Sequence, residues 1–161
     1  MEGDLTIRPA RDGDADGLIA LIGACFSEYP NCILEVDGEM PELRAIATWA
    51  RSLGGLFWIV ERGGGVVGSV GVTPASDPGG VELRKLYVAA EVRRRGLGGH
   101  LCDLVEEEAQ RRGAAYVDLW SDTRFVDAHR LYLRRGYRQT GTTRELHDLS
   151  DTIEYYFRKQ F

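Results

Sequence analysis

The chain has 161 residues, the size of one ordinary domain, with 43% hydrophobic and 28% charged residues, so wholesale disorder is excluded. Its net charge of −5 argues against nucleic acid as the main partner, and its longest strongly apolar run, Leu56–Val60, is far too short to cross a membrane. We therefore expect a single domain over residues 1–161, with neither nucleic acid nor a membrane as its partner.

The start of the chain, residues 1–4, is acidic and no apolar stretch follows it, so no secretory signal is predicted. The chain has three cysteines: Cys25, Cys32 and Cys102. They are too few and too scattered for a disulfide framework, which favours a reduced, cytoplasmic protein. The histidines lack the spacing of metal ligands, so we expect no metal site and expect His100 and His129 on helix surfaces.

The hydrophobic pattern predicts, in chain order, a strand at Leu5–Pro9, a helix over 14–26 and a loop over 27–39. Pro41 is well placed to begin a second helix, which ends near Leu53. The elements that follow are strands at Leu56–Glu61, Val66–Thr73 and Val81–Val88, a helix at Leu97–Arg112, a strand at Tyr116–Trp120, a helix at Phe125–Arg135, and strands at Arg138–Leu146 and Thr152–Arg158. The order βααβββαβαββ predicts an α/β protein of the α+β type, with a mostly antiparallel mixed sheet of about seven strands and helices on both faces.

Charge is unevenly distributed along the chain. Eight acidic residues and no Lys or Arg lie between Asp12 and Leu43, whereas twelve basic and eight acidic residues lie between Arg84 and Arg138. Two interpretations stay open: both segments are solvated surface, or one end of the fold attracts cations and another attracts anions.

Two glycine-rich stretches have different meanings. Gly63, Gly65 and Gly68 match the G-x-G-x-x-G pattern of dinucleotide sites, but a strand follows them, so a hairpin is predicted instead. The second stretch, Arg93-Arg94-Arg95-Gly96-Leu97-Gly98, lies between a strand and a helix. Its glycines allow close backbone approach, and the free N–H groups of a helix start bind anions, so a pyrophosphate is the expected guest.

Two blocks of sequence at the right separation resemble the GNAT superfamily of N-acetyltransferases, which use acetyl-coenzyme A (acetyl-CoA). The strand over 82–88 and the stretch 93–98 resemble the family's fourth strand and the loop after it. Residues 128–137, AHRLYLRRGY, resemble the family block A-x-x-L-Y-x-x-x-G-F. The resemblance implies the acyl-CoA N-acyltransferase fold, with acetyl-CoA as co-substrate. It implies these cofactor-binding residues: Leu86, Val88, Arg93, Arg94, Arg95, Gly96, Leu97, Gly98 and Gly99.

Two local features qualify the resemblance. Phe125 stands where the family often has an asparagine, which removes one expected polar contact to the cofactor's pantetheine arm. The period-2 pattern of the 82–88 strand slips near Arg84 and Lys85, which indicates a β-bulge. The resemblance implies a bulge in this strand, where the sheet opens to admit the arm.

The resemblance also implies roles in catalysis. It places the N–H of Val88 near the thioester carbonyl, where it stabilises the oxyanion. Tyr132 is the expected acid for the departing thiolate, because a phenol of pKa about 10 roughly matches a thiol; the alternative is a ring packed in the core. Glu82 is the candidate base, acting through water, and the alternative is a strand carboxylate paired with Arg84.

The loop after the first helix lines the acceptor pocket in proteins that this sequence resembles. The candidate acceptor-pocket residues are Glu28, Tyr29, Glu35 and Asp37. Their acidity favours a cationic primary amine on a small molecule or a peptide, such as a polyamine, an aminoglycoside or a protein amino group. A second copy of the chain, as a homodimer, stays open as a partner.

Three functional hypotheses remain. The first is an acetyl-CoA-dependent N-acetyltransferase that acts by direct attack in a ternary complex. The second is a non-catalytic module of the same fold that binds or senses acyl-CoA, which the Phe125 departure keeps open. The third is a transferase for a longer acyl group, which needs a wider pocket.

Overall fold

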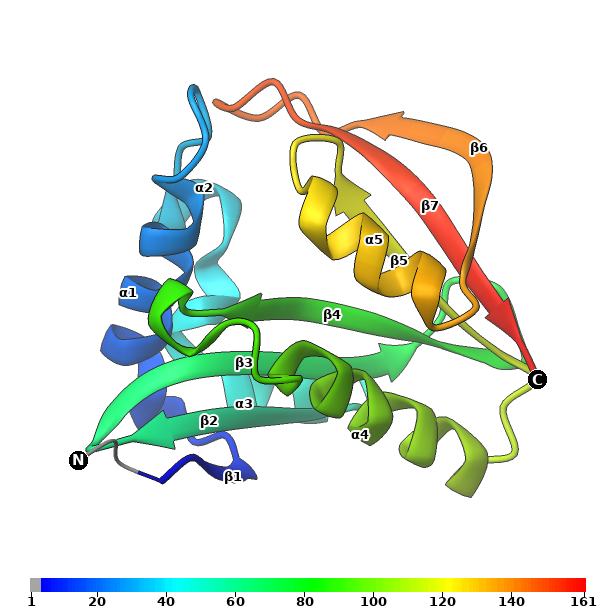
Figure 1. The fold of residues 1–161 in the computed structure, drawn as a ribbon, viewed down its shortest axis with the longest axis horizontal. Coiled ribbons are helices and arrows are strands. Elements are labelled where there is room, and N and C mark those ends of the chain that lie inside the picture. The colour runs from blue at the N-terminus through cyan, green and yellow to red at the C-terminus, as the bar shows by residue number, and fades with distance from the viewer. Residues whose placement is uncertain (1–3) are drawn as a thin grey trace.

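The computed structural model describes residues 4–161, so most of the acidic start of the chain lies outside the described residues. In the described part, seven strands form one sheet in the order β1-β2-β3-β4-β5-β7-β6, in which only β4 and β5 run parallel (Figure 1). The strands are β1 (Thr6–Pro9), β2 (Leu56–Arg62), β3 (Gly65–Pro74), β4 (Gly80–Val88), β5 (Tyr116–Asp122), β6 (Arg138–Glu145) and β7 (Ile153–Gln160). The predicted mostly antiparallel mixed sheet is confirmed.

The helices agree with the predicted order, with two corrections. They are α1 (Ala15–Phe26), α2 (Val36–Glu39), α3 (Ile46–Ser52), α4 (Leu97–Arg111) and α5 (Val126–Arg134). The predicted helix from Pro41 is instead a 3-10 turn, Pro41–Ala45, followed by α3, and the predicted loop over 27–39 contains the short α2. Ala45 has φ −150°, outside the helical range, and so it separates the two segments.

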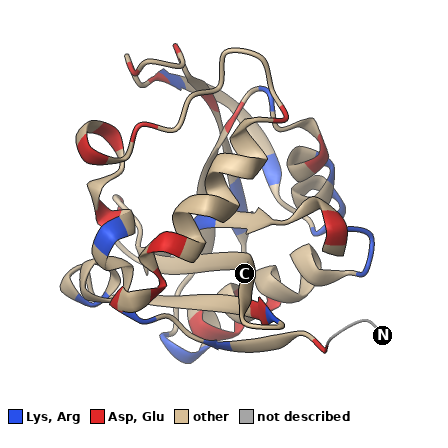
Figure 2. Ribbon diagram, turned by 90° about the vertical axis from the view of Figure 1, so that its left-hand side faces the viewer, with Lys and Arg blue, Asp and Glu red and all other residues tan. Residues whose placement is uncertain are grey.

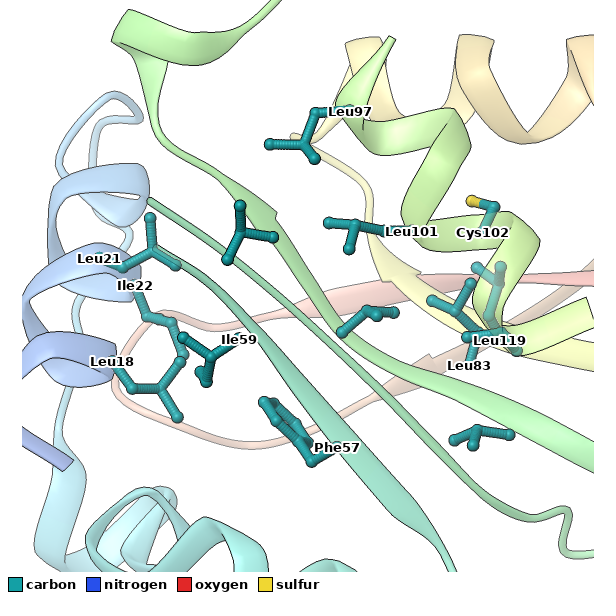
Figure 3. Close-up of a cluster of buried hydrophobic side chains, with 14 of the residues drawn as sticks. Leu18, Leu21, Ile22, Phe57, Ile59, Leu83, Leu97, Leu101, Cys102 and Leu119 are labelled. Atoms are coloured by element: carbon teal, nitrogen blue, oxygen red, sulfur yellow. The ribbon is translucent and has the colours of Figure 1, made fainter. Parts of the chain in front are cut away.

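Helices cover both faces of the sheet because each has one apolar stripe. Leu18, Leu21 and Ile22 of α1 pack toward Phe57 and Ile59 of β2 (Figure 3). On the other face lie α4, which buries apolar side chains against β4 and β5, and α5, which packs beside it (Figures 1 and 3). No helix among residues 4–161 has the length and apolar character needed to cross a membrane.

The predicted bulge in β4 is present. Ser69 of β3 pairs with Tyr87, but Gly71 pairs with Arg84, so β4 has one extra residue between these pairs. Lys85 lies in this bulge with φ +51°, a left-handed conformation that is uncommon for a residue with a side chain. The extra residue explains why the alternation of the sequence slips at this point.

Candidate active site

The sheet opens between its two parallel strands. β4 and β5 pair over only three residue pairs, the last being Glu82 with Asp118, although both strands continue beyond it. Figure 1 shows the two strands close together at one end and apart at the other. Two cavities lie at this opening, and four residues line both of them: Leu86, Tyr87, Phe125 and Ala128.

The first cavity, which we call the α4 cavity, has a volume of about 670 Å³. The start of α4 lines it with Gly96, Leu97, Gly98 and Gly99. Gly96 precedes the helix with φ +76°, and no side chain caps the helix. The first N–H groups of an α-helix have no intrahelical acceptor, so this wall offers backbone donors and the positive end of the helix dipole. These features fit a pyrophosphate.

The arginines near this wall have different positions. Arg93 and Arg94 line the α4 cavity, as do Arg130 and Arg134 of α5, whereas Arg95 is not among the lining residues. Arg130 and Arg134 were not predicted, although their spacing of four residues places them on one helix face. Four arginines among the lining residues make this cavity rich in positive charge, which a diphosphate requires, although one of them, Arg93, pairs with Glu28.

Glu28 was predicted in the acceptor pocket, but the structure places it beside Arg93. Arg93 donates to both carboxylate oxygens of Glu28, at 2.6 and 2.7 Å, and its Nε donates to the carbonyl of Val88 at 3.0 Å. The paired guanidinium lowers the pKa of Glu28. Arg93 therefore links the chain after α1 to the end of β4. Tyr29, also predicted in the acceptor pocket, lines the α4 cavity and not the other cavity.

The backbone of β4 directs the N–H of Val88 toward the opening. Alternate residues of an antiparallel pair bond to the same neighbouring strand. The N–H of Ala89 donates to the carbonyl of Val67 at 2.9 Å, so the N–H of the preceding residue, Val88, points away from β3. Val88 also lines the α4 cavity, and the predicted oxyanion donor thus lies at the edge of β4 that faces the gap.

The second cavity, which we call the loop cavity, has a volume of about 550 Å³ and is lined by the chain around α2, by β4 and β5, and by the chain between β6 and β7. Five carboxylates line it: Glu35, Glu39, Asp122, Asp148 and Glu154. Only Glu35 of the predicted acceptor residues is among the lining residues. Asp37 lies outside, largely exposed and paired with Arg44 at 2.7 Å.

In the folded chain, basic residues offset part of the negative charge of the acidic segment over 12–43. Bases from other segments pair with several of its carboxylates, and Figure 2 shows both acidic and basic positions on this side of the fold. The pairs are Asp14 with Arg8, Glu28 with Arg93, Asp37 with Arg44, and Glu42 with Lys85. The carboxylates that line the loop cavity, rather than the acidic run as a whole, define its charge.

Tyr132 lines the loop cavity close to the residues that both cavities share. Its ring packs against Phe157 and Tyr137, with centroids 5.6 and 5.9 Å apart, and the residue is only 4% exposed. Burial raises the pKa of the phenol, so the hydroxyl is fully protonated at neutral pH. The two alternatives from the sequence are therefore compatible, because the ring belongs to the core and the residue also lines the cavity.

Glu82 is not among the lining residues of either cavity. Its Oε2 lies 3.5 Å from Nε of Arg84, and its side chain is 13% exposed. Burial raises the pKa of Glu82, and the charge of Arg84 opposes that shift. Glu82 lies beside Asp118 at the point where β4 and β5 separate, so any proton transfer between Glu82 and a ligand in the loop cavity requires a bridging water.

The raised pKa of Glu82 predicts a pH-dependent effect on stability. A carboxyl whose pKa is higher in the folded state stabilises the fold below its unfolded pKa of about 4.3, and this contribution is lost as pH rises through the folded value. We therefore expect Glu82→Gln to raise the free energy of unfolding at about pH 8 but not at about pH 4. Denaturant titrations at both pH values measure this, with exposed Glu107→Gln as the control. Equal effects of Glu82→Gln at both pH values would contradict the assignment.

His129 is buried, so its prediction as a surface residue was wrong. It lies on the face of α5 that packs on the sheet, with ring contacts to Tyr155 and Phe157. Its Nε2 lies 3.0 Å from the carbonyl oxygen of Asp122 and 3.1 Å from Oγ of Ser121. A carbonyl only accepts, so Nε2 carries the proton, and burial lowers the pKa of the ring. His129 is thus a neutral support for the β5 wall of the loop cavity.

The fold and the site have three features together. The mixed sheet opens between two strands, a helix start suited to a diphosphate lies beside the opening, and a second cavity lies next to it. The model of the acetyltransferase (GNAT) family matches residues 20–137. An acetyltransferase of the GNAT family from Staphylococcus aureus Mu50 superposes with a TM-score of 0.81 at 20% identity, over 98% of this chain and 99% of that one. PaiA N-acetyltransferase from Thermoplasma acidophilum, solved in complex with coenzyme A, superposes with a TM-score of 0.72 at 17% identity, over 98% of this chain and 99% of that one.

Curated relatives are similar over part of their length. N-acetylaspartate synthetase of Danio rerio is 31% identical over 117 residues, which are 73% of this chain and 40% of that protein. Aminoalkylphosphonate N-acetyltransferase of Salmonella typhimurium is 39% identical over 59 residues, which are 37% of this chain and 38% of that protein. The matches thus span about 40% of the length of these relatives. The chain belongs to the acetyltransferase (GNAT) family.

Proposed function

We propose that this protein transfers an acetyl group from acetyl-CoA to a primary amine by direct attack within a ternary complex. The observation that carries the proposal is the meeting of two cavities at the opening between β4 and β5. One cavity has a wall suited to a diphosphate, and the other is lined by carboxylates. Leu86, Tyr87, Phe125 and Ala128 line both, so a thioester in one and an amine in the other reach a common point.

The chain's own groups suit binding and orientation of the cofactor. The backbone N–H groups at the start of α4 hold the pyrophosphate, with the guanidinium groups of Arg94 and Arg130 beside it. Leu86, Tyr87 and Val88 of β4, which line the α4 cavity, would hold the pantetheine arm. When bound, acetyl-CoA supplies a thioester whose carbonyl carbon is attacked by the amine. The N–H of Val88 then donates to the carbonyl oxygen as negative charge develops on it.

Two side chains take part in proton transfer, one to the sulfur and one from the nitrogen. Tyr132 donates the proton that the sulfur needs as the carbon–sulfur bond breaks. Glu82 accepts the proton that the amine nitrogen loses, through a water at the separation of β4 and β5. The amine becomes an amide, the sulfur leaves as a thiol, and one proton is transferred at each end. Burial raises the pKa of the Tyr132 phenol, so its hydroxyl is protonated at neutral pH, although the same shift makes it a weaker acid.

The acceptor enters the loop cavity in its ammonium form and loses one proton to solvent, so that the neutral amine attacks the thioester. The five carboxylates that line this cavity attract a cation, which supports a cationic amine as the acceptor. The relative named for aminoalkylphosphonates supports a small molecule over a large one. The cavity volume of about 550 Å³ is also in the range of small-molecule sites.

An acceptor-panel assay tests the proposal. The protein is incubated with acetyl-CoA and a set of primary amines, and free thiol is measured together with the mass of the product. Amine-dependent thiol release with an acetylated product is expected. Tight binding of acetyl-CoA with no release above the background for any amine would instead support the alternative, a non-catalytic module that binds acyl-CoA.

The position of the carboxylates predicts which of them affect the acceptor. Glu35 and Glu39 line the loop cavity, and Gln at either position keeps an oxygen for the bonds to the N–H groups of Gly38 and Leu149. We expect Glu35→Gln and Glu39→Gln each to raise KM for a cationic amine about two- to five-fold, with kcat nearly unchanged. Exposed Asp37→Asn is the matched control and should leave KM unchanged. Equal KM values for all variants across a salt series would remove these carboxylates from acceptor binding.

A further inference from the structure

The bulge in β4 brings a lysine to the wall of the loop cavity. Lys85 has φ +51°, and its carbonyl, which the bulge removes from the regular ladder, accepts a hydrogen bond from Oγ of Ser69 at 2.8 Å. Arg84, the preceding residue, is not among the residues that line either cavity, whereas Lys85 lines the loop cavity. The extra residue therefore gives the acceptor side of β4 a cationic side chain.

The ammonium of Lys85 is held in place but is not saturated. Its Nζ donates to Oε1 of Glu42 at 3.1 Å and lies 5.6 Å from the ring centroid of Trp49. The side chain is 12% exposed. An ammonium has three N–H donors, and within residues 4–161 the one hydrogen bond described for it uses one of them. The other two N–H donors have no acceptor described within residues 4–161.

The other charged side chains that line the loop cavity are carboxylates. Lys85 is the one Lys or Arg among the described residues that line the loop cavity. The lining carboxylates are held by the protein: Glu154, for example, accepts from Nε of Arg144 at 2.7 Å, and Asp148 accepts from the N–H of Thr152 at 2.8 Å. The cavity is therefore lined by five carboxylates and one ammonium, and that ammonium also pairs with Glu42, which is not among the lining residues.

We propose that Lys85 binds an acidic group of the acceptor, so that the acceptor carries both a primary amine and a carboxylate or similar acid. The inference rests on the proposed function and names the substrate class of the same site. The carboxylates attract the ammonium end of such a molecule, and Lys85 binds its other end by charge-assisted hydrogen bonds. Burial lowers the pKa of the Lys85 amine, so a bound anion also supports the charged form of this side chain.

Matched acceptors test the inference. A series of amino acids of different length and side chain is compared with the corresponding carboxamides, which have nearly the same shape but no negative charge. The amine of an amide is less basic, which favours the amide, so a preference for the acid does not arise from amine protonation. We expect kcat/KM for the best acid to exceed that for its amide roughly 10- to 100-fold, mainly through KM.

Three variants test whether Lys85 causes the preference for the acid over its carboxamide. Lys85→Met is expected to reduce the acid-to-amide ratio to near one, and Lys85→Arg to retain most of it. Arg84→Met is the matched control, because Arg84 lies next in the strand, with its guanidinium 5.0 Å from the centroid of the same Trp49 ring, but is not among the lining residues. The ratio should be unchanged in Arg84→Met, whatever happens to the absolute rate.

The outcomes separate the two proposals. Turnover of simple amines and carboxamides with no preference for the acids would overturn the role of Lys85 and leave the acetyltransferase proposal standing. No turnover with any amine would overturn both. If Lys85→Met does not fold, the wild-type ratio and its retention in Lys85→Arg decide, and a wild-type ratio near one overturns the inference.

Discussion

Tyr132→Phe is expected to lower kcat about 10²- to 10⁴-fold while the affinity for acetyl-CoA stays the same. The substitution removes only the hydroxyl, and the ring contacts with Phe157 and Tyr137 are retained. The loss is confined to the step in which the sulfur takes up a proton. Steady-state kinetics with a saturating amine measure kcat, and calorimetry with CoA measures affinity.

Tyr137→Phe is the matched control for this variant. Tyr137 lies next to Tyr132 in the core, but its hydroxyl bonds to Glu106 at 3.2 Å and it is not among the residues that line either cavity. We expect Tyr137→Phe to lower the free energy of unfolding by about 1 kcal/mol and to leave kcat unchanged. Full activity of Tyr132→Phe at neutral pH would leave solvent as the proton source.

Gly98→Val is expected to lower the affinity for CoA tenfold or more, because charge-assisted hydrogen bonds to the pyrophosphate contribute roughly 1.5–3 kcal/mol each. Gly98 lies in the first turn of α4 and lines the α4 cavity, so a branched side chain there obstructs approach to the backbone N–H groups. A Cβ at this position would also lie 3.0 Å from Cδ2 of Leu131, so the Leu131 side chain must shift slightly to accommodate it.

Calorimetry with CoA measures this effect, after circular dichroism and thermal unfolding have established that the variant is folded. Gly13→Val serves as the control, because a Cβ there has no neighbour within 4 Å and the site is far from α4 in the sequence. We expect its affinity to equal that of the wild type. A folded Gly98→Val protein with unchanged affinity would rule out the start of α4 as the pyrophosphate site.

The order of helices and strands was predictable from the sequence because it depends on local patterns. Side chains alternate with a period of two in strands and repeat every 3.6 residues in helices, and glycine and proline mark the ends. The slip of this pattern at Arg84 and Lys85 even located the bulge, which the structure confirms between Ser69 and Gly71 of the neighbouring strand. The stretch 93–98 was placed correctly at the start of a helix for the same local reason.

Only the tertiary structure decided which charges meet and which side chains are buried. Glu28 is separated from Arg93 by 65 residues and Lys85 from Glu42 by 43, so no local pattern reveals that these groups form ion pairs. The burial of His129 likewise depends on how α5 is rotated against β5 and β7, which its polar neighbours in the sequence do not indicate. The division of the site into two cavities follows from the separation of β4 and β5 after Glu82 and Asp118. Sequence patterns report the period and ends of each element, whereas electrostatic pairing and cavities arise between elements that only the folded chain brings together.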